Sequence, residues 1–348
     1  MSEVSYLPVK GEYHDNFLTA QVAAGGRLDR ECQKSLFDRL DWLDQLHRLA
    51  LRDKPPLLLR AQQGDADAWM PLMRQGNGHH VALANWYNFS WRPIFGGAYD
   101  EVTRMALLRQ FAQSAKDRTR RLTLAPVPDE DGSASQIAAA FASSGWVVEM
   151  SACDENHHLR VKGRTFDEYW AGRPGQLKNT VKRKGKKGVV SIRIEQTFDE
   201  AAWRDYERIY ARSWKPSEGS PEFLMQLARQ EGAAGNLRLG LAYIDGQPVA
   251  AQFWTVEHKT ALIHKLAHDE RHLASSPGTL LSAALFQHVI DIDKVAEIDF
   301  GTGSDPYKRE WMEEMRPRFR IDLLWPNHIA NWPMIARHHL RQMRGKDA

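Results

Sequence analysis

One stretch of sequence decides the fold. It reads Ala261-Leu262-Ile263-His264-Lys265-Leu266-Ala267, then Ser275-Ser276-Pro277-Gly278-Thr279-Leu280-Leu281, and then Glu297-Ile298-Asp299-Phe300-Gly301. The first and third runs are largely apolar and end in polar or glycine-rich turns, which is typical of strands. The middle run predicts the start of a helix that continues to about Ile290. The stretch therefore predicts a strand, a helix and a strand in that order, which is an α/β pattern.

The helix start has the features of an anion site. Ser276 is a suitable N-cap, and Pro277 fits the first helical position, where a missing N–H costs nothing. Gly278 has no Cβ, so a ligand can lie close to the first turn. The unpaired N–H groups and the positive end of the helix dipole favour an anion such as a pyrophosphate. An ordinary capped helix that binds nothing has the same pattern, so the pattern alone leaves both interpretations open.

Polar side chains follow the third run. Tyr307 and Lys308 come after a glycine-rich turn, at the start of another helix. The phenol of tyrosine, with an ordinary pKa near 10, can protonate a departing thiolate. A lysine can stabilise an oxyanion or a phosphate as a point charge, and Asp299 can orient Lys308 or remove a proton from an amine. The structural alternatives are a tyrosine packed at a helix start, an exposed first-turn lysine and a carboxylate that caps a turn.

These motifs resemble those of a known superfamily. The run Ser276-Pro277-Gly278-Thr279-Leu280-Leu281 resembles the Gly-x-Gly-x-x-Leu end of the pyrophosphate loop in GNAT acyltransferases. Tyr307 lies where those enzymes often carry the tyrosine that protonates the thiolate, and Tyr307-Lys308 with Trp311 looks like the Phe-Lys-x-x-Phe signature of FemAB aminoacyltransferases. Over residues 160–325 the chain is most similar to the CelD-like, FemAB-related acetyltransferases of bacterial exopolysaccharide gene clusters.

The resemblance implies a fold and a reaction. The fold is an α/β (α+β) fold with two tandem GNAT-like domains, each a mixed twisted sheet flanked by helices. The reaction is transfer of an acyl group, most simply acetyl, from acyl-CoA to an amine acceptor in polysaccharide or cell-envelope biosynthesis. The acceptor would be an amino acid, an amino sugar, or a nucleotide- or lipid-linked sugar. Tyr307, Lys308 and Asp299 would be the catalytic residues. The residues implied in coenzyme A binding are Ser275, Ser276, Gly278, Thr279, Leu280, Leu266 and Ala267.

Two departures from the family pattern keep other functions open. Ser276 replaces the first loop glycine, and Leu273 stands where a Gln or Arg normally helps to hold the pyrophosphate. FemAB proteins with a similarly altered loop use aminoacyl-tRNA as the donor, so tRNA is the alternative donor here. A non-catalytic GNAT-like protein that binds nucleic acid or another partner is the second alternative.

The remaining pattern predicts two domains and a tail. Capping boxes at Thr165–Glu168 and Thr197–Glu200, and the hairpin turn Asp245-Gly246, organise the second half. We predict a degenerate N-terminal GNAT-like domain over residues 1–162, because its turn Phe95–Ala98 lacks the anion-loop pattern. The catalytic domain would span residues 163–325, and a basic helical tail would span residues 326–348.

Aromatic and histidine side chains are the candidates for substrate binding. Tyr210 and Trp214 end an aromatic stripe at helical spacing, which is typical of a core but also suits a pocket. In the resembling family, a Ser-Trp or Arg-Trp pair near Trp214 borders the acceptor groove. His264 and His268 share one face of the predicted strand, and one of them can act as a general base. We expect no metal site, because a third ligand is missing.

A basic run precedes the catalytic motifs. Residues 173–187 contain no acidic residue and seven basic ones: Arg173, Lys178, Lys182, Arg183, Lys184, Lys186 and Lys187. Lys182 and Arg183 are the candidates for docking an anionic donor or acceptor. A solvated helix face and a tRNA-binding surface are the alternatives, although the run lacks the interleaved aromatic residues of single-strand binders.

Composition bounds the location. The 348 residues suffice for two domains. No run approaches the ~18 apolar residues that a transmembrane helix needs, and residues 1–17 lack the apolar segment of a signal peptide. Cys32 and Cys153 lie in no paired motif, so we expect the reducing cytoplasm. Trp332 to Arg344 is basic and amphipathic; we expect it to pack on the body, with weak attachment to an anionic membrane face as the alternative.

Overall fold

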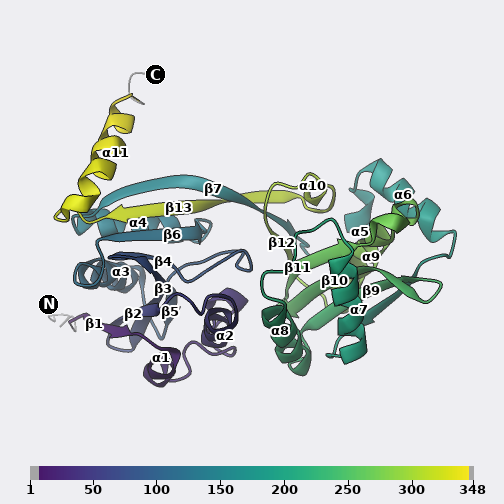
Figure 1. Cartoon of the computed structure of the whole chain (residues 1–348), viewed down its shortest axis with the longest axis horizontal. Helices are drawn as coiled ribbons and strands as arrows, with labels where there is room; N and C mark the ends of the chain where they lie inside the picture. The colour runs from purple at the N-terminus through teal and green to yellow at the C-terminus, as the bar shows by residue number, and fades with distance from the viewer. Residues whose placement is uncertain (1–7, 345–348) are drawn as a thin grey trace. The chain divides into compact units, whose positions relative to one another are not determined.

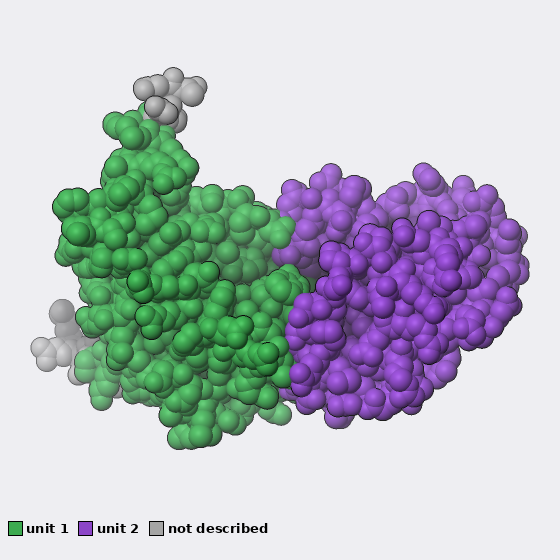
Figure 2. Space-filling model, in the orientation of Figure 1, with its two compact units in different colours: residues 1–154, 317–348 green, residues 155–316 purple. Residues whose placement is uncertain are grey.

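The computed structural model, which describes residues 8–344, separates into two units (Figures 1 and 2). Unit 1 comprises residues 1–154 and 317–348, and unit 2 comprises residues 155–316. The chain passes from one unit to the other within two long strands, β7 (Val147–Arg160) and β13 (Glu314–Leu324). None of the helices in the described part of the chain is both long and apolar enough to cross a membrane.

Unit 1 is built on a mixed sheet with helices against it. In chain order its elements are β1 (Lys10–His14), α1 (Phe17–Ala24), α2 (Leu40–Ala50), β2 (Pro56–Gln63), β3 (Ala66–Gly76), β4 (His79–Ala82), β5 (Ile94–Gly96), α3 (Glu101–Ala115), β6 (Arg121–Val127), α4 (Ser133–Ser143) and, after β13, α11 (Trp332–Arg344). The strands follow the order β1-β2-β3-β4-β6-β13, and β5 pairs with β3. Strand β4 is parallel to β6, and the other described pairs are antiparallel.

Unit 2 repeats this plan. Its elements are α5 (Phe166–Ala171), α6 (Gly175–Gly185), β8 (Ser191–Glu195), α7 (Glu200–Ala211), α8 (Pro221–Ala233), β9 (Leu237–Ile244), β10 (Gln247–Glu257), β11 (Thr260–His268), α9 (Pro277–Gln287), β12 (Glu297–Thr302) and α10 (Lys308–Trp311). The strands follow the order β7-β12-β11-β10-β9-β8. From β1 and from β8 onward, each unit runs strand, two helices, a run of strands, helix, strand, helix and strand. The run has three strands in unit 2 and four in unit 1, where the short β5 is the extra one. The predicted α/β fold with two similar halves is confirmed.

The units differ from the sequence-based division at three places. The first boundary lies after Asp154, within β7, and not after residue 162. Strand β13 pairs with β6 from Phe319 to Leu324, so the end of this strand belongs to unit 1 and not to the second half. Helix α11 belongs to unit 1 as well. Contacts between segments far apart in the sequence place β13 and α11 in unit 1, and no local sequence signal reports such contacts.

The local signals in unit 2 are mostly confirmed. Thr165 and Glu168 form the predicted capping box of α5. Asp245 and Gly246 have φ values of 48° and 73°, as a two-residue hairpin turn between β9 and β10 requires. The second predicted capping box, with Thr197 as the cap, is wrong. Helix α7 begins at Glu200, and its N-cap is Asp199, whose side chain accepts the N–H of Ala202 at 2.8 Å.

The parallel pair β11–β12 opens the sheet beside α9. Thr260–Leu262 pairs with Glu297–Asp299. Strand β11 continues to His268 and β12 to Thr302, with no registered pairing between them in the described residues. The ends of the two strands therefore leave a place for side chains and ligands that a continuous ladder would close.

Gly240 sets how closely α9 approaches β9. A Cβ on Gly240 would lie 2.8 Å from Cδ1 of Leu285 and 2.9 Å from Cδ1 of Leu281, both of which are fully buried on α9. These distances are well inside van der Waals contact, so glycine allows the helix to pack directly on the strand.

We predict that Gly240→Ala lowers the free energy of unfolding by about 1–3 kcal/mol, because the added methyl group overpacks the contact with α9. Urea unfolding followed by circular dichroism measures the change. Gly175→Ala is the matched control, because a Cβ on Gly175 meets no atom within 4 Å. Equal stability of the two variants would contradict this account of the contact.

Candidate active site

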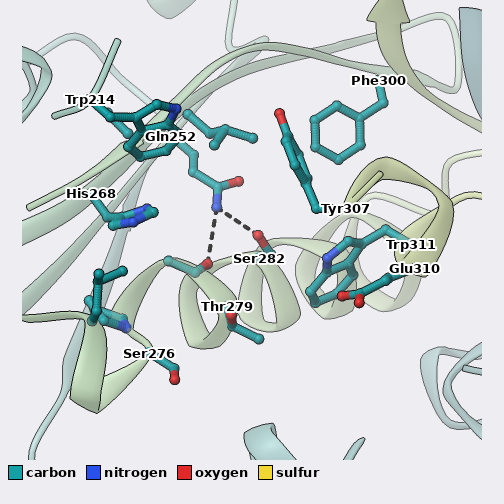
Figure 3. Close-up of a pocket in the computed structure, with 15 residues that line it drawn as sticks. Trp214, Gln252, His268, Ser276, Thr279, Ser282, Phe300, Tyr307, Glu310 and Trp311 are labelled. Carbon is teal, nitrogen blue, oxygen red and sulfur yellow. Dashed lines mark hydrogen bonds between the residues drawn. The ribbon is translucent and has the colours of Figure 1, made fainter. Parts of the chain in front are cut away.

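A cavity of about 280 Å³ lies in unit 2 between the end of β11 and the first turn of α9 (Figure 3). Leu266, Ala267 and His268 line it from β11. Residues 276–279 and Ser282 line it from α9, and its other lining residues are Trp214, Gln252, Leu273, Phe300, Tyr307, Glu310 and Trp311. The structure thus brings most of the residues predicted for coenzyme A binding to one cavity. Ser275 and the buried Leu280 do not line it.

The first turn of α9 presents unpaired amides. Ser276 occupies the N-cap position, but its side chain makes no capping hydrogen bond, and its backbone is left-handed with φ 50°. The N–H of Leu280 donates to the Ser276 carbonyl at 3.1 Å. No partner of the N–H groups of Gly278 and Thr279 is found among the described residues. The prediction of Ser276 as a side-chain cap is therefore wrong, and the helix dipole and two amides are left for an anion.

Gly278 has a packing role in addition to the predicted one. A Cβ at this position would lie 3.3 Å from Nδ1 of His268, so glycine lets the end of β11 approach the helix. The ring of Trp214 lies 4.4 Å from that of His268, centroid to centroid. The two rings form one wall of the cavity, as Figure 3 shows. Burial lowers the pKa of His268, so its imidazole is neutral at physiological pH.

Gln252 was missed by the sequence analysis. Its side chain is almost fully buried on β10 and donates to Oγ of Ser282 at 2.7 Å and to the Gly278 carbonyl at 3.3 Å (Figure 3). Its Oε1 accepts the indole N–H of Trp254 at 3.0 Å. These bonds fix the first turn of α9 to the sheet. A single amide within the apolar run of residues 248–254 is the signal that would have found it.

Tyr307 lines the cavity as predicted. Its ring packs edge-on against Phe300 with the centroids 5.7 Å apart, and its hydroxyl points away from α9 (Figure 3). Burial, with a smaller contribution from the Asp305 carboxylate, raises the pKa of this phenol. Tyr307 therefore holds its proton across the physiological range and acts as a hydrogen-bond donor.

Lys308 and Asp299 do not line the cavity. The buried ammonium of Lys308 donates to the carbonyls of Thr302 and Gly303. Asp299 accepts from the Gly301 N–H at 2.7 Å, from Asn156 at 2.7 Å and from Arg316 at 2.8 Å. These bonds shape the turn that leads to Tyr307, and they differ from the predicted Asp299–Lys308 pairing. Direct roles of the two side chains in catalysis stay predictions.

The two histidines on β11 have different surroundings. Lys265 pairs with Phe253 and Ile263 pairs with Trp254, so His264 is the extra residue of a β-bulge. Its Nε2 lies 2.8 Å from Oγ1 of Thr255. Burial, with a smaller effect of the Lys265 ammonium, lowers the pKa of His264 to about 3. Among residues 8–344, no group of three or more His, Cys, Asp and Glu side chains is arranged to hold a metal.

Tyr210 lies at a second cavity. This cavity has a volume of about 390 Å³ and is lined by α7, the start of α8 and the segment between them, including Lys215 and Glu218. Lys265 forms an ion pair with Glu218 at 2.9 Å. Of the predicted substrate-binding aromatic residues, Trp214 therefore lines the first cavity and Tyr210 the second.

The basic helix α6 ends beside the start of α9. The ammonium of Lys184 donates to the carbonyl of Ala274, just before the first turn of α9. A Cβ on Gly185 would lie 3.9 Å from Leu280 of α9. Lys182 and Arg183 are exposed on the same last turn of α6. Lys184 thus brings one positive charge of this run to the segment just before α9.

A family model described as an acetyltransferase (GNAT) domain matches residues 173–309, which include all the residues that line the cavity except Glu310 and Trp311. This part of the chain therefore matches the GNAT domain family in sequence. The predicted resemblance to GNAT acyltransferases is confirmed. None of the curated proteins matches the sequence.

Solved structures extend the similarity of fold to most of the chain. The structure of FemX has a TM-score of 0.59 at 9% identity, covering 89% of this chain and 96% of that one. The C-terminal domain of a putative lysylphosphatidylglycerol synthetase from Agrobacterium fabrum has a TM-score of 0.56 at 14% identity, covering 88% and 92%. L-PGS from Bacillus licheniformis has a TM-score of 0.52 at 13% identity, covering 86% and 95%. At these identities the likeness shows the fold.

Unit 1 has the order of a GNAT domain but a different helix start. Helix α3 follows β4 and β5 in unit 1, as α9 follows β11 in unit 2. The carboxylate of Asp100 caps α3 by accepting the N–H of Thr103 at 2.8 Å. That carboxylate bonds one amide of the first turn and adds a negative charge there, which disfavours a bound anion. Helix α9 has no such capping carboxylate.

We predict that His264 makes the protein less stable in acid. The unfolded state takes up a proton as the pH falls below the ordinary pKa of 6.5, whereas the folded state takes it up near 3. Stability is therefore full above about pH 6.5 and declines towards pH 3. In His264→Gln, the slope of unfolding free energy against pH in this window should fall by up to about 1.4 kcal/mol per pH unit. Urea unfolding at a series of pH values measures it, with His258→Gln in an exposed turn as the control; identical slopes in all three proteins would refute the prediction.

Proposed function

We propose that the protein is an N-acyltransferase that transfers an acyl group, most simply acetyl, from acyl-CoA to an amine. The observation that carries the proposal is the uncapped first turn of α9 beside a cavity that also holds the phenol of Tyr307. A pyrophosphate would accept hydrogen bonds from the amides of Gly278 and Thr279. The pantetheine arm would run along Leu266 and Ala267 at the unpaired end of β11.

The basic end of α6 supports an anionic donor. Lys182 and Arg183 are exposed close to Lys184, which is bonded to the segment before α9. Their positive field would attract the phosphates of coenzyme A and would weaken as the ionic strength rises. Because they are exposed, we assign them to steering and docking and not to the reaction itself.

The reaction would use groups in the cavity. The amine nitrogen attacks the thioester carbonyl, a C–N bond forms and the C–S bond breaks. Tyr307 donates a hydrogen bond or its proton to the leaving sulfur, and the neutral imidazole of His268 accepts the proton that the amine loses. The sulfur leaves as a thiolate hydrogen-bonded to Tyr307 and takes up the proton that the imidazole accepted, so the products are an amide and the free thiol. Burial raises the pKa of Tyr307, so complete proton transfer is harder than for a free phenol, and hydrogen-bond donation is its main contribution.

The proposed acceptor is an amine of a carbohydrate or amino acid. An amino sugar or amino acid destined for a polysaccharide or the cell envelope, including a nucleotide- or lipid-linked sugar, suits an aromatic wall such as Trp214 with polar groups nearby. Two free, exposed cysteines, Cys32 and Cys153, are compatible with the proposed cytoplasmic location.

Aminoacyl-tRNA is the alternative donor. Leu273 lines the cavity where the resembling family carries Gln or Arg, and the basic α6 and the FemX-like fold both suit it. Activity that disappears on ribonuclease treatment and does not depend on coenzyme A would favour this alternative.

We predict that Thr279→Glu weakens acetyl-CoA binding by ten- to a hundredfold, because like charges about 5 Å apart near a protein surface repel by a few kcal/mol. The same change should leave stability unchanged or raise it by about 0.3–1 kcal/mol, since an acidic residue in a first turn favours the dipole. Isothermal titration calorimetry measures the affinity. Thr279→Gln is the matched control of similar size without the charge. If both variants bind acetyl-CoA as the wild type does, the amides of α9 do not hold the pyrophosphate.

We predict that Tyr307→Phe lowers kcat by one to three powers of ten, a range typical of losing one proton donor. Affinity for acetyl-CoA and thermal stability should change little, because the ring and its contact with Phe300 remain. Thiol release with a panel of amines measures the rate. Tyr99→Phe, on an exposed segment of unit 1, is the control. Wild-type turnover in Tyr307→Phe would remove the phenol from the mechanism.

A further inference from the structure

Helix α11 carries an exposed apolar stripe. Trp332, Leu340 and Met343 are 59%, 52% and 58% exposed. Together with the exposed Ala336 they follow the spacing i, i+4, i+8 and i+11, which places them on one side of the helix. Ile329, in the short turn before α11, is 71% exposed. Such a row is unusual on a water-facing helix, where single apolar residues are the norm.

The opposite side of α11 is fixed to unit 1. His338 is buried, and the guanidinium of Arg341 donates to Glu149 of β7 at 2.7 Å. Arg121 of β6 donates to the sulfur of Met334 at 3.4 Å. These contacts hold the helix so that the stripe points outward, and α11 projects from the rest of unit 1 (Figures 1 and 2).

The charge of the segment has one sign. Residues 323–346 contain no Asp or Glu, whereas they contain Arg337, Arg341, Arg344 and Lys346 together with three histidines. A surface that offers both an apolar layer and negative charge matches this composition. Two such segments from two copies of the chain would bring like charges together, which disfavours pairing of α11 with itself.

We propose that α11 docks on the surface of an anionic phospholipid bilayer. Trp332, Leu340 and Met343 enter the boundary between head groups and acyl chains, and the indole of Trp332 lies at the level where tryptophan is favoured in membranes. The arginines of the segment attract the anionic head groups. This inference does not depend on the proposed acyl transfer.

Sedimentation of the full chain with vesicles tests the proposal. With vesicles of equal parts phosphatidylglycerol and phosphatidylcholine, we expect the wild type to pellet at low salt and to be released as salt rises. Pure phosphatidylcholine vesicles should bind less. The double variant Leu340→Glu with Met343→Glu should lose roughly tenfold or more in partition coefficient, since it removes two apolar groups and adds two negative charges.

A matched control uses another exposed apolar pair in the same unit. Leu18 and Val22 on α1 are 73% and 79% exposed, so Leu18→Glu with Val22→Glu makes the same chemical change elsewhere. This variant should bind the anionic vesicles as the wild type does. The proposal is overturned if the wild type does not bind them, or if both double variants behave alike. Light scattering tests whether the stripe instead binds a second copy of the chain. A wild-type dimer that the α11 variant breaks, without vesicle binding, would also overturn the proposal.

Discussion

The amides at the start of α9 are the feature on which the site depends. Each N–H group buried without a partner costs about 1–3 kcal/mol, so a helix start of this kind is stable only when water or a ligand supplies the acceptor. Ser276 adds backbone strain of about 1–2 kcal/mol, because a residue with a Cβ adopts a left-handed conformation there. The surrounding contacts hold this turn in place. Gly240 allows α9 to lie close to the sheet, Gln252 bonds the first turn to β10, and Lys184 bonds the segment before it.

The turn between β12 and α10 positions Tyr307 at the cavity. Lys308 and Asp299 satisfy the carbonyls and amides of this turn from the inside, with Arg316 and Asn156 as further partners of Asp299. Tyr307 is thereby held next to Phe300 at the cavity. The sequence pattern suggested catalytic roles for Lys308 and Asp299 because side chains of these types suit catalysis. In the structure both side chains are buried and bonded to the turn, where they support the position of Tyr307.

Local signals predicted the parts of the site that depend on neighbours in sequence. The strand, helix and strand around residues 261–301, the capping box at Thr165 and the hairpin at Asp245-Gly246 are set by caps, turns and apolar runs. The sequence analysis missed what depends on distant partners. The pairing of β13 with β6, the bulge at His264 and the bonds of Gln252 each require knowledge of which segments lie side by side. The side chain of Ser276 was misassigned because cap propensity does not report the left-handed backbone.

The two units share a topology but differ at one helix start. In both units a helix follows the run of strands, α3 after β4 and β5 and α9 after β11, and both units have one parallel strand pair, β4–β6 and β11–β12. In unit 1 the carboxylate of Asp100 satisfies the helix start, which stabilises the helix and repels an anion. In unit 2 the corresponding turn has no side-chain cap and a basic helix lies next to it. Because topology is shared and electrostatics is not, we infer that a few side chains at one helix end decide whether a unit can bind an anion there.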